Sequence, residues 1–431
     1  MTQSLIRNKK IRIFGGGLIG LNIAFELSRT KDVAPENIEI CEKNKSILSA
    51  WDSVNFDDIA CNNGFHGIET PRAEGVVQLL KVLGCSEELV EINNRRIICI
   101  NGEEIEFGRS LANWPIELRR GLDGIIKNNK KKMNLNKNEM MYIIGETELG
   151  KVIKRIYDRF AGNIDDCWHL VYPWFFPNEF LFEGNDEGAI FQNKVRNNEI
   201  NPKYILPKKG LFNSLVPLIE NQLKRMRIKT NLNINASFNE ICSETRQESA
   251  MTIWCASSFG VLKHIDKKLA NACITDCRHM RLILLSMGTD NYFEWSDKYD
   301  YQPTELLFMD ETIPTLNRVS FPQQPKLSNK FKSSKVYLLA EYFSKSRDME
   351  RKTVEKVRAC LERLFACSIN IEGSIYGRPM YNFSEELYYT AKEKVEDFAI
   401  MNNLHIPEIY FGPINMAKCA MISESFLRRT R

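Results

Sequence analysis

The chain has 431 residues, enough for two or three domains, and 43% of them are hydrophobic, which is enough to build their cores. Its 59 basic and 55 acidic residues leave a formal charge of only +4, which argues against nucleic acid or a membrane surface as a partner and favours a small-molecule substrate. The first residues, MTQSLIRNKK, lack the apolar core of a signal peptide, and no run of about eighteen apolar residues occurs. We therefore expect a folded cytoplasmic protein without a membrane span.

The first predicted unit is a strand, a glycine turn, a helix and a second strand. Residues 11–14 (IRIF) suit a buried strand, three glycines follow, and apolar residues recur at helical spacing through 18–29. A second apolar run, residues 38–41, ends at Glu42, twenty-two residues beyond Gly20. This order forms a dinucleotide-binding fingerprint. The alternative is a structural glycine turn in an unrelated α/β unit, and the fingerprint alone does not separate FAD from NAD.

Each fingerprint position has a physical role. Gly15 allows a tight turn, Gly17 lets a pyrophosphate approach the backbone, and Gly20 lets the helix pack closely on the strand. The diphosphate would rest on N–H groups at the positive end of the helix, and Glu42 would accept hydrogen bonds from a ribose, which disfavours the 2′-phosphate of NADP. The predicted cofactor contacts of this unit are Gly15, Gly17, Leu18, Ile19, Gly20, Glu42 and Lys43.

Cysteine and histidine placement predicts no metal site. The twelve cysteines include no CxxC pair, and the five histidines show no HExxH or Cys–His ligand spacing. We expect reduced thiols that behave as small buried hydrophobic residues. Cys273 and Cys277 have a spacing that predicts one face of a helix.

Four separated blocks of the chain share a pattern with one flavoprotein superfamily. They are the N-terminal fingerprint, residues 61–84 (CNNGFHGIETPRAEGVVQLLKVLG), residues 205–241 (from ILPKKGLF to SFNEI) with the strand-like stretch 252–258 (TIWCASS) after them, and residues 409–426 (IYFGPINMAKCAMISESF). In content and order they resemble the FAD-dependent amine oxidase and protoporphyrinogen oxidase superfamily, including its UDP-galactopyranose mutase branch.

The resemblance implies an α/β fold and FAD as the cofactor. A Rossmann-like, glutathione-reductase-like FAD-binding domain would be assembled from residues 1–84, 205–260 and 401–431. Residues 85–204 and 261–400 would form an inserted α+β substrate domain, with a mainly antiparallel sheet in its second part. A flavin cleft would lie between the two domains.

The second insertion reads as β structure covered by a helix. Apolar runs with strand character occur at 281–289, 304–311, 316–323 and 335–344, and a charged helical pattern covers 349–365. In the first insertion, the aromatic residues at 168–176 would serve either as core or as stacking surfaces for sugars or heterocycles. The lysine-rich run at 127–137 reads as a solvated loop.

The resemblance also implies flavin contacts outside the fingerprint. The Gly-x-His segment Gly64, Phe65 and His66 would lie near the isoalloxazine. Near the flavin pyrimidine, the N-terminus of the last helix would offer backbone N–H groups, with Gly412, Asn415 and Met416 as the contacts. Ser49 and Ala50 stand where the family carries two glycines, so a contact from that loop to the diphosphate stays open.

Five side chains are candidates for the catalytic site. His66 is bracketed by glycines that let the backbone approach a ring. Arginine suits a carboxylate or a phosphate, which singles out Arg318 and Arg378 beside prolines and aromatic residues. The resemblance places Tyr376 and Tyr381 near the substrate. Turn hydrogen bonds, salt bridges and ordinary packing explain these five residues about as well.

Three functions follow from the resemblance. The first is an oxidoreductase in which flavin N5 takes a hydride equivalent from a small polar substrate such as an amine, an alcohol or a sugar. The second is a reduced-flavin isomerase of a nucleotide sugar, like the mutase branch, with arginines holding the diphosphate. The third is a flavin-binding protein with a degenerate catalytic site. We place the oxidoreductase first because that activity is the commoner one in the superfamily.

Overall fold

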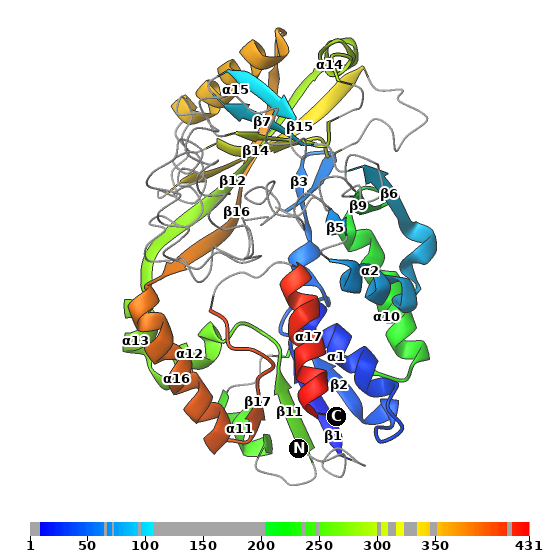
Figure 1. Cartoon of the computed structure of the whole chain (residues 1–431), viewed down its shortest axis with the longest axis vertical. Helices are drawn as coiled ribbons and strands as arrows, with labels where there is room; N and C mark the ends of the chain where they lie inside the picture. The colour runs from blue at the N-terminus through cyan, green and yellow to red at the C-terminus, as the bar shows by residue number, and fades with distance from the viewer. Residues whose placement is uncertain are drawn as a thin grey trace, which may run out of the picture.

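The computed structural model describes residues 9–63, 67–70, 73–93, 96–100, 102–106, 203–234, 238–245, 250–299, 303–308, 316–322, 334–344, 351–411 and 416–430. The sequence predictions for residues 64–66, 127–137, 168–176 and 412–415 lie outside this part of the chain. Within it, the fold is mixed α/β, with one parallel sheet and one mainly antiparallel sheet (Figure 1).

The parallel sheet joins three distant parts of the chain. Each neighbouring pair in the order β10–β2–β1–β11–β17 is parallel. Ile11, Ile13, Ile38 and Ile40 are fully buried in it, as expected for a parallel sheet with helices on both faces. The strands are β1 (Lys10–Phe14), β2 (Ile38–Cys41), β10 (Lys229–Asn231), β11 (Ala250–Trp254) and β17 (Leu404–His405).

Helix α1 (Leu18–Ser28) packs between this sheet and the last helix, α17 (Met416–Thr430) (Figure 1). Its residues Leu21, Ile23 and Ala24 are fully buried because they have a partner on both sides. The Ser423 hydroxyl of α17 donates to the Ile19 carbonyl at 3.5 Å. The two ends of the chain are therefore joined around one core, to which α2 (Glu74–Leu80) and α10 (Val216–Arg225) also contribute.

The opposite face and the β17 edge carry the other helices. Helix α11 (Phe238–Thr245) packs on β11, while α12 (Phe259–Ile265), α13 (Lys267–Cys273) and α16 (Glu385–Met401) form one cluster beside β17. The Asp266 carboxylate caps α13 by accepting from the Leu269 N–H at 2.8 Å. The single helix face predicted for Cys273 and Cys277 is wrong, because α13 ends at Cys273 and Cys277 lies in the following strand.

The second sheet has the order β16–β12–β15–β14–β13–β7–β8, and every pair is antiparallel except β13–β7. The strands predicted in the second insertion and the helix predicted at 349–365 are confirmed. One face of the sheet packs on α14 (Thr289–Ser296) and α15 (Arg351–Phe365) (Figure 1). The strands are β7 (Arg96–Ile100), β8 (Glu103–Glu106), β12 (Ile274–Gly288), β13 (Glu305–Phe308), β14 (Leu316–Ser320), β15 (Lys335–Ser344) and β16 (Asn370–Phe383).

Two small sheets lie where the large sheets meet. The hairpin of β3 (Ser53–Phe56) and β4 (Ile59–Asn62) packs Phe56 and Cys61 on the other face of the antiparallel sheet. Gly373 makes room for this contact, because a Cβ there would lie 3.0 Å from Phe56 Cδ1. The second small sheet is antiparallel and has the order β5 (Ile68–Thr70), β9 (Lys203–Pro207) and β6 (Leu89–Asn93).

No helix among the described residues is both long enough and apolar enough to cross a membrane.

His405 on β17 gives the fold a pH-dependent contribution. Burial, with a smaller effect from Lys9, lowers the pKa of His405 below its usual value. The unfolded chain therefore binds this proton more tightly, so the contribution is present above a pH of about 6.5 and is lost as the pH falls towards the folded-state pKa. We expect His405→Gln to lose less thermal stability than the wild type between pH 7 and pH 5, as measured by circular dichroism. Parallel melting curves at all pH values would contradict this.

Candidate dinucleotide site

The glycine turn after β1 has the geometry that the fingerprint predicts. Gly15 has a φ of +115°, and a Cβ on it would lie 2.9 Å from the Ala256 nitrogen. A Cβ on Gly20 would lie 2.0 Å from the Gly15 carbonyl oxygen. A Cβ on Gly17, in contrast, would meet no atom of the described residues within 4 Å. Two of the three glycines therefore serve the close packing of the chain, and the third borders open space.

Helix α1 begins at that open position without a side-chain cap. Gly17 is its N-cap residue, and the first turn carries no acidic side chain. The N–H groups at the start of a helix have no partner within the helix and carry partial positive charge. This end of α1 is therefore suited to bind an anionic group.

Glu42 follows β2 directly and is only 8% exposed. Its Oε2 accepts from the Gly16 N–H at 2.8 Å, and its Oε1 accepts from the Asn44 N–H at 2.9 Å and from Asn44 Nδ2 at 2.7 Å. A carboxylate has about four acceptor positions, so the bonds from the described residues leave one on Oε2. Glu42 thus fixes the glycine turn itself, a role that sequence analysis missed, and its contact with a ribose stays a prediction.

Asn44 holds the loop that carries Ser49 and Ala50. Its Nδ2 also donates to Ser49 Oγ at 2.7 Å, and the Leu48 N–H donates to the Gly16 carbonyl at 2.9 Å. The loop therefore lies against the glycine turn. In the sequence, the role of Asn44 is indicated only by its position two residues after Glu42. From there, its own N–H and side chain can reach the Glu42 carboxylate.

The chain after β11 borders the same turn and holds the segment that leads to α17. The Ser258 N–H donates to the Tyr410 carbonyl at 2.9 Å, and the Tyr410 N–H donates to Ser258 Oγ at 3.3 Å. The Tyr410 hydroxyl donates to the Cys255 carbonyl at 3.1 Å, and Ser257 Oγ donates to the Phe411 carbonyl at 3.3 Å. The ends of β1, β2 and β11 thus converge at the carboxyl edge of the parallel sheet, where open α/β sheets bind ligands.

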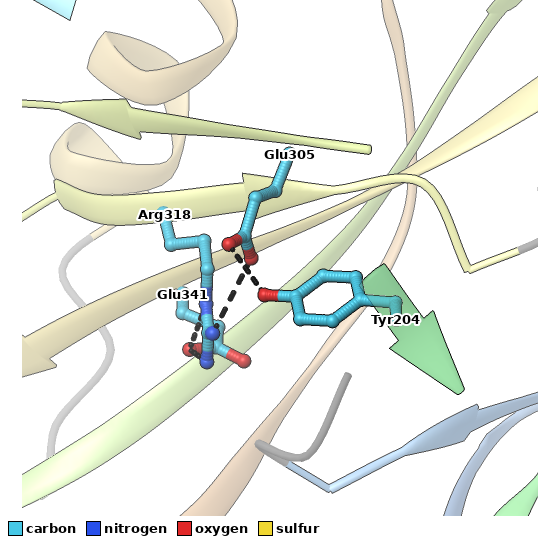
Figure 2. A network of polar contacts seen from close by, with 4 residues as sticks. All are labelled: Tyr204, Glu305, Arg318 and Glu341. Atoms are coloured by element: carbon cyan, nitrogen blue, oxygen red, sulfur yellow. Dashed lines mark hydrogen bonds and ion pairs between the residues drawn. The ribbon is translucent and has the colours of Figure 1, made fainter. Parts of the chain in front are cut away.

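A buried polar network lies on the antiparallel sheet (Figure 2). Arg318 donates from Nη2 to Glu341 Oε2 at 2.8 Å and from Nη1 to Glu305 Oε2 at 3.4 Å. The Tyr204 hydroxyl donates to Glu305 Oε1 at 2.9 Å. Burial opposes the charge of Arg318, but the carboxylates of Glu341 and Glu305 outweigh it and raise its pKa. The charge of Arg318 is therefore compensated within the protein.

The structure describes the other catalytic candidates less completely than Arg318. Tyr376 lies on β16 with 48% of its surface exposed, and the guanidinium carbon of the fully buried Arg281 lies 3.3 Å from its ring centroid. Arg378 and Tyr381 lie on the same strand, but their side chains are outside the description. His66, Gly64, Phe65, Gly412 and Asn415 are outside it altogether, and Met416 is described only as the first residue of α17. Lys43 is exposed beside Glu42.

Within the described ranges, no group of three or more His, Cys, Asp or Glu residues could hold a metal ion.

Neither a protein-family model nor a curated protein sequence matches the chain. Solved structures match over nearly the whole length. A protein from Exiguobacterium sp. 255-15 that carries the name of a protoporphyrinogen oxidase has a TM-score of 0.63 at 13% identity, covering 98% of this chain and 99% of that one. A reduced UDP-galactopyranose mutase has a TM-score of 0.62 at 13% identity, with 98% and 92% covered. Cyclohexylamine oxidase from Brevibacterium oxydans has a TM-score of 0.59 at 10% identity, with 98% and 99% covered.

The chain therefore shares its fold with these three solved structures.

Proposed function

We propose that the protein is an FAD-dependent oxidoreductase that takes a hydride equivalent from a small polar substrate. The observation that carries this proposal is the uncapped start of α1 at Gly17, beside Glu42, at the carboxyl edge of the parallel sheet. The fold shared with oxidoreductases supports it.

The residues of the glycine turn fit the diphosphate and ribose of a dinucleotide. The N–H groups at the start of α1 would hold the diphosphate, because Gly17 leaves room for close approach. The remaining acceptor position of Glu42 would take a ribose hydroxyl. Burial and the hydrogen bonds to Gly16 and Asn44 keep this carboxylate in place.

The proposed FAD domain comprises residues 1–84, 205–260 and 401–431. Each of these pieces contributes to the parallel sheet, which supports the division. Strands from both 85–204 and 261–400 pair in the antiparallel sheet, which supports one substrate domain built from two insertions. Because α12, α13 and α16 pack beside β17, the boundaries near 260 and 400 would move so that these helices join the FAD domain.

The chemistry divides between the cofactor and the chain. When bound, FAD supplies the hydride acceptor. Tyr410 and Ser258 would hold the segment before α17, and the N–H groups at the start of that helix would stabilise negative charge on the reduced ring by about 0.3–1 kcal/mol. His66, Tyr376, Tyr381 and Arg378 remain the proposed substrate-side residues.

Arg318 bears on the choice between the proposed functions. A mutase-like enzyme needs arginines that clamp an anionic diphosphate, but Arg318 already faces two carboxylates on the antiparallel sheet. A third anion at this guanidinium would be repelled by both carboxylates. This favours the oxidoreductase over the nucleotide-sugar isomerase.

Reconstitution with FAD tests the proposal. We expect purified protein to retain a yellow chromophore after incubation with excess FAD and desalting, and FAD to be released on denaturation. NAD and NADP supplied in place of FAD should not be retained. Folded protein that stays colourless would exclude the whole family of flavin functions.

Turnover then separates the three functions. An oxidoreductase consumes one equivalent of acceptor for each product. Without an acceptor, its oxidised flavin gives one turnover, and flavin that dithionite has already reduced gives none. An isomerase requires the reduced flavin and consumes no acceptor. Bound FAD with no turnover of amines, alcohols, sugars or nucleotide sugars in either redox state would favour a degenerate site.

A further inference from the structure

Tyr204 joins the small sheet β5–β9–β6 to the antiparallel sheet. Its ring lies directly on the backbone of Gly67, where a Cβ would be 2.8 Å from Tyr204 Cγ and 3.0 Å from Cδ1. Its hydroxyl reaches Glu305 on β13 at 2.9 Å (Figure 2). Gly67 therefore has to be a glycine for the ring to lie where its hydroxyl meets this carboxylate.

The Glu305 acceptor is held rigidly. Glu305 is 1% exposed and pairs with Arg318, which in turn binds Glu341 through both Nε and Nη2. A guanidinium held by two buried carboxylates has little freedom to move, and a hydrogen bond to an ionised acceptor is stronger than a neutral one. The network thus gives the Tyr204 hydroxyl a fixed anchor on β13, β14 and β15.

The same part of the chain also holds Asn62, two residues before the Gly-x-His segment. Asn62 Nδ2 donates to the Gly210 carbonyl at 2.8 Å, and the Phe212 N–H donates to Asn62 Oδ1 at 3.1 Å. Residues 204–212 therefore fix Asn62 on one side of the segment 63–66 and Gly67 on the other.

We infer that Tyr204 is a positioning residue of the flavin site, which acts by fixing Gly67, the residue directly after the predicted flavin-contacting segment, to the Glu305–Arg318–Glu341 network of the antiparallel sheet. The inference rests on the proposed function. It assigns to the hydroxyl of Tyr204 an effect on the bound flavin, in addition to any effect on folding.

Tyr204→Phe tests this role, and Tyr292→Phe is the matched control. Tyr292 is also fully buried, but it packs on the opposite face of the antiparallel sheet, and its hydroxyl has no hydrogen-bond partner among the described residues. Both changes remove one buried hydroxyl. We expect Tyr204→Phe to weaken FAD binding about tenfold and to shift the visible absorption band of the bound flavin. Tyr292→Phe should leave the FAD affinity within about twofold of wild type and the band unchanged.

A second variant separates positioning from general stability. Glu305→Gln keeps an acceptor oxygen for the Tyr204 hydroxyl, so its FAD affinity, corrected for the folded fraction measured by circular dichroism, should stay within about threefold of wild type. Wild-type protein that binds no FAD would refute the proposed function. Wild-type protein that binds FAD, with Tyr204→Phe matching Tyr292→Phe in affinity and spectrum, would refute only the role of Tyr204.

Discussion

Replacing Gly17 by Asp is expected to stabilise the apoprotein and to abolish FAD binding. Gly17 is the N-cap of α1 and has extended backbone angles, φ −79° and ψ −177°, that Asp adopts readily. The new carboxylate would accept hydrogen bonds from the first turn and meet the positive end of the helix, a gain of about 0.5–1 kcal/mol. It would also occupy the N–H groups proposed for the diphosphate and repel it, which should weaken FAD binding by at least about 100-fold. Urea unfolding without FAD and titration with FAD measure the two effects.

Gly17→Asn is the control for this substitution. Asparagine is an equally good N-cap of nearly the same shape, but it carries no charge. It should stabilise the apoprotein in a similar way and weaken FAD binding less than Asp does. If Gly17→Asp bound FAD as tightly as the wild type, the diphosphate would have to lie elsewhere.

Replacing Arg318 by Met is expected to destabilise the protein by about 3 kcal/mol, because it leaves two buried carboxylates without the cation between them. Glu305 and Glu341 are each 1% exposed, so water does not replace the lost partner. The free energy of unfolding in urea, measured at neutral pH, gives this loss. It should shrink at low pH, where the carboxylates of the variant become protonated.

Arg12→Met is a control with closely similar exposure. The Arg12 side chain is 23% exposed and pairs with Glu39 across β1 and β2 at 2.7 Å, whereas the Arg318 side chain is 21% exposed. Glu39 keeps Lys10 at 3.1 Å and the Asn231 side chain as partners, so this change should cost only about 1 kcal/mol. Equal losses of unfolding free energy in the two variants would show that the Glu305–Arg318–Glu341 network stabilises the protein no more than the Arg12–Glu39 pair does.

The dinucleotide unit could be predicted because its parts are close in sequence. The glycine turn, α1 and β2 lie within residues 11–42. Gly20 packs against the carbonyl of Gly15, which is only five residues earlier in the chain. Four strands of the antiparallel sheet, β12, β13, β14 and β15, were predictable for the same reason, from short apolar runs, whereas β7, β8 and β16 were not predicted. The failure at Cys273 and Cys277 shows the limit of such reasoning, because a spacing of four residues does not reveal a helix end between them.

The polar network could not be predicted, because its members come from four strands. Tyr204 and Glu305 are separated by 101 residues, and pairing of β13, β14 and β15 brings Arg318 between its two carboxylates. The acids Glu305 and Glu341 stand in the apolar segments ELLF and LLAEYF, and this was the only signal that they are buried. Sequence analysis left Arg318 open between a contact to a substrate anion and an ordinary salt bridge, and could not name its partners.

The sequence by itself determined the fingerprint, four strands of the antiparallel sheet and the helix at 349–365, since backbone sterics and hydrophobic periodicity act over a few residues. Only the tertiary structure decided that Glu42 fixes the glycine turn, that residues 204–212 hold both sides of segment 63–66, and that Arg318 is compensated. Those contacts depend on which distant strands become neighbours. Strand pairing is set by the burial of the whole core, which no local pattern encodes.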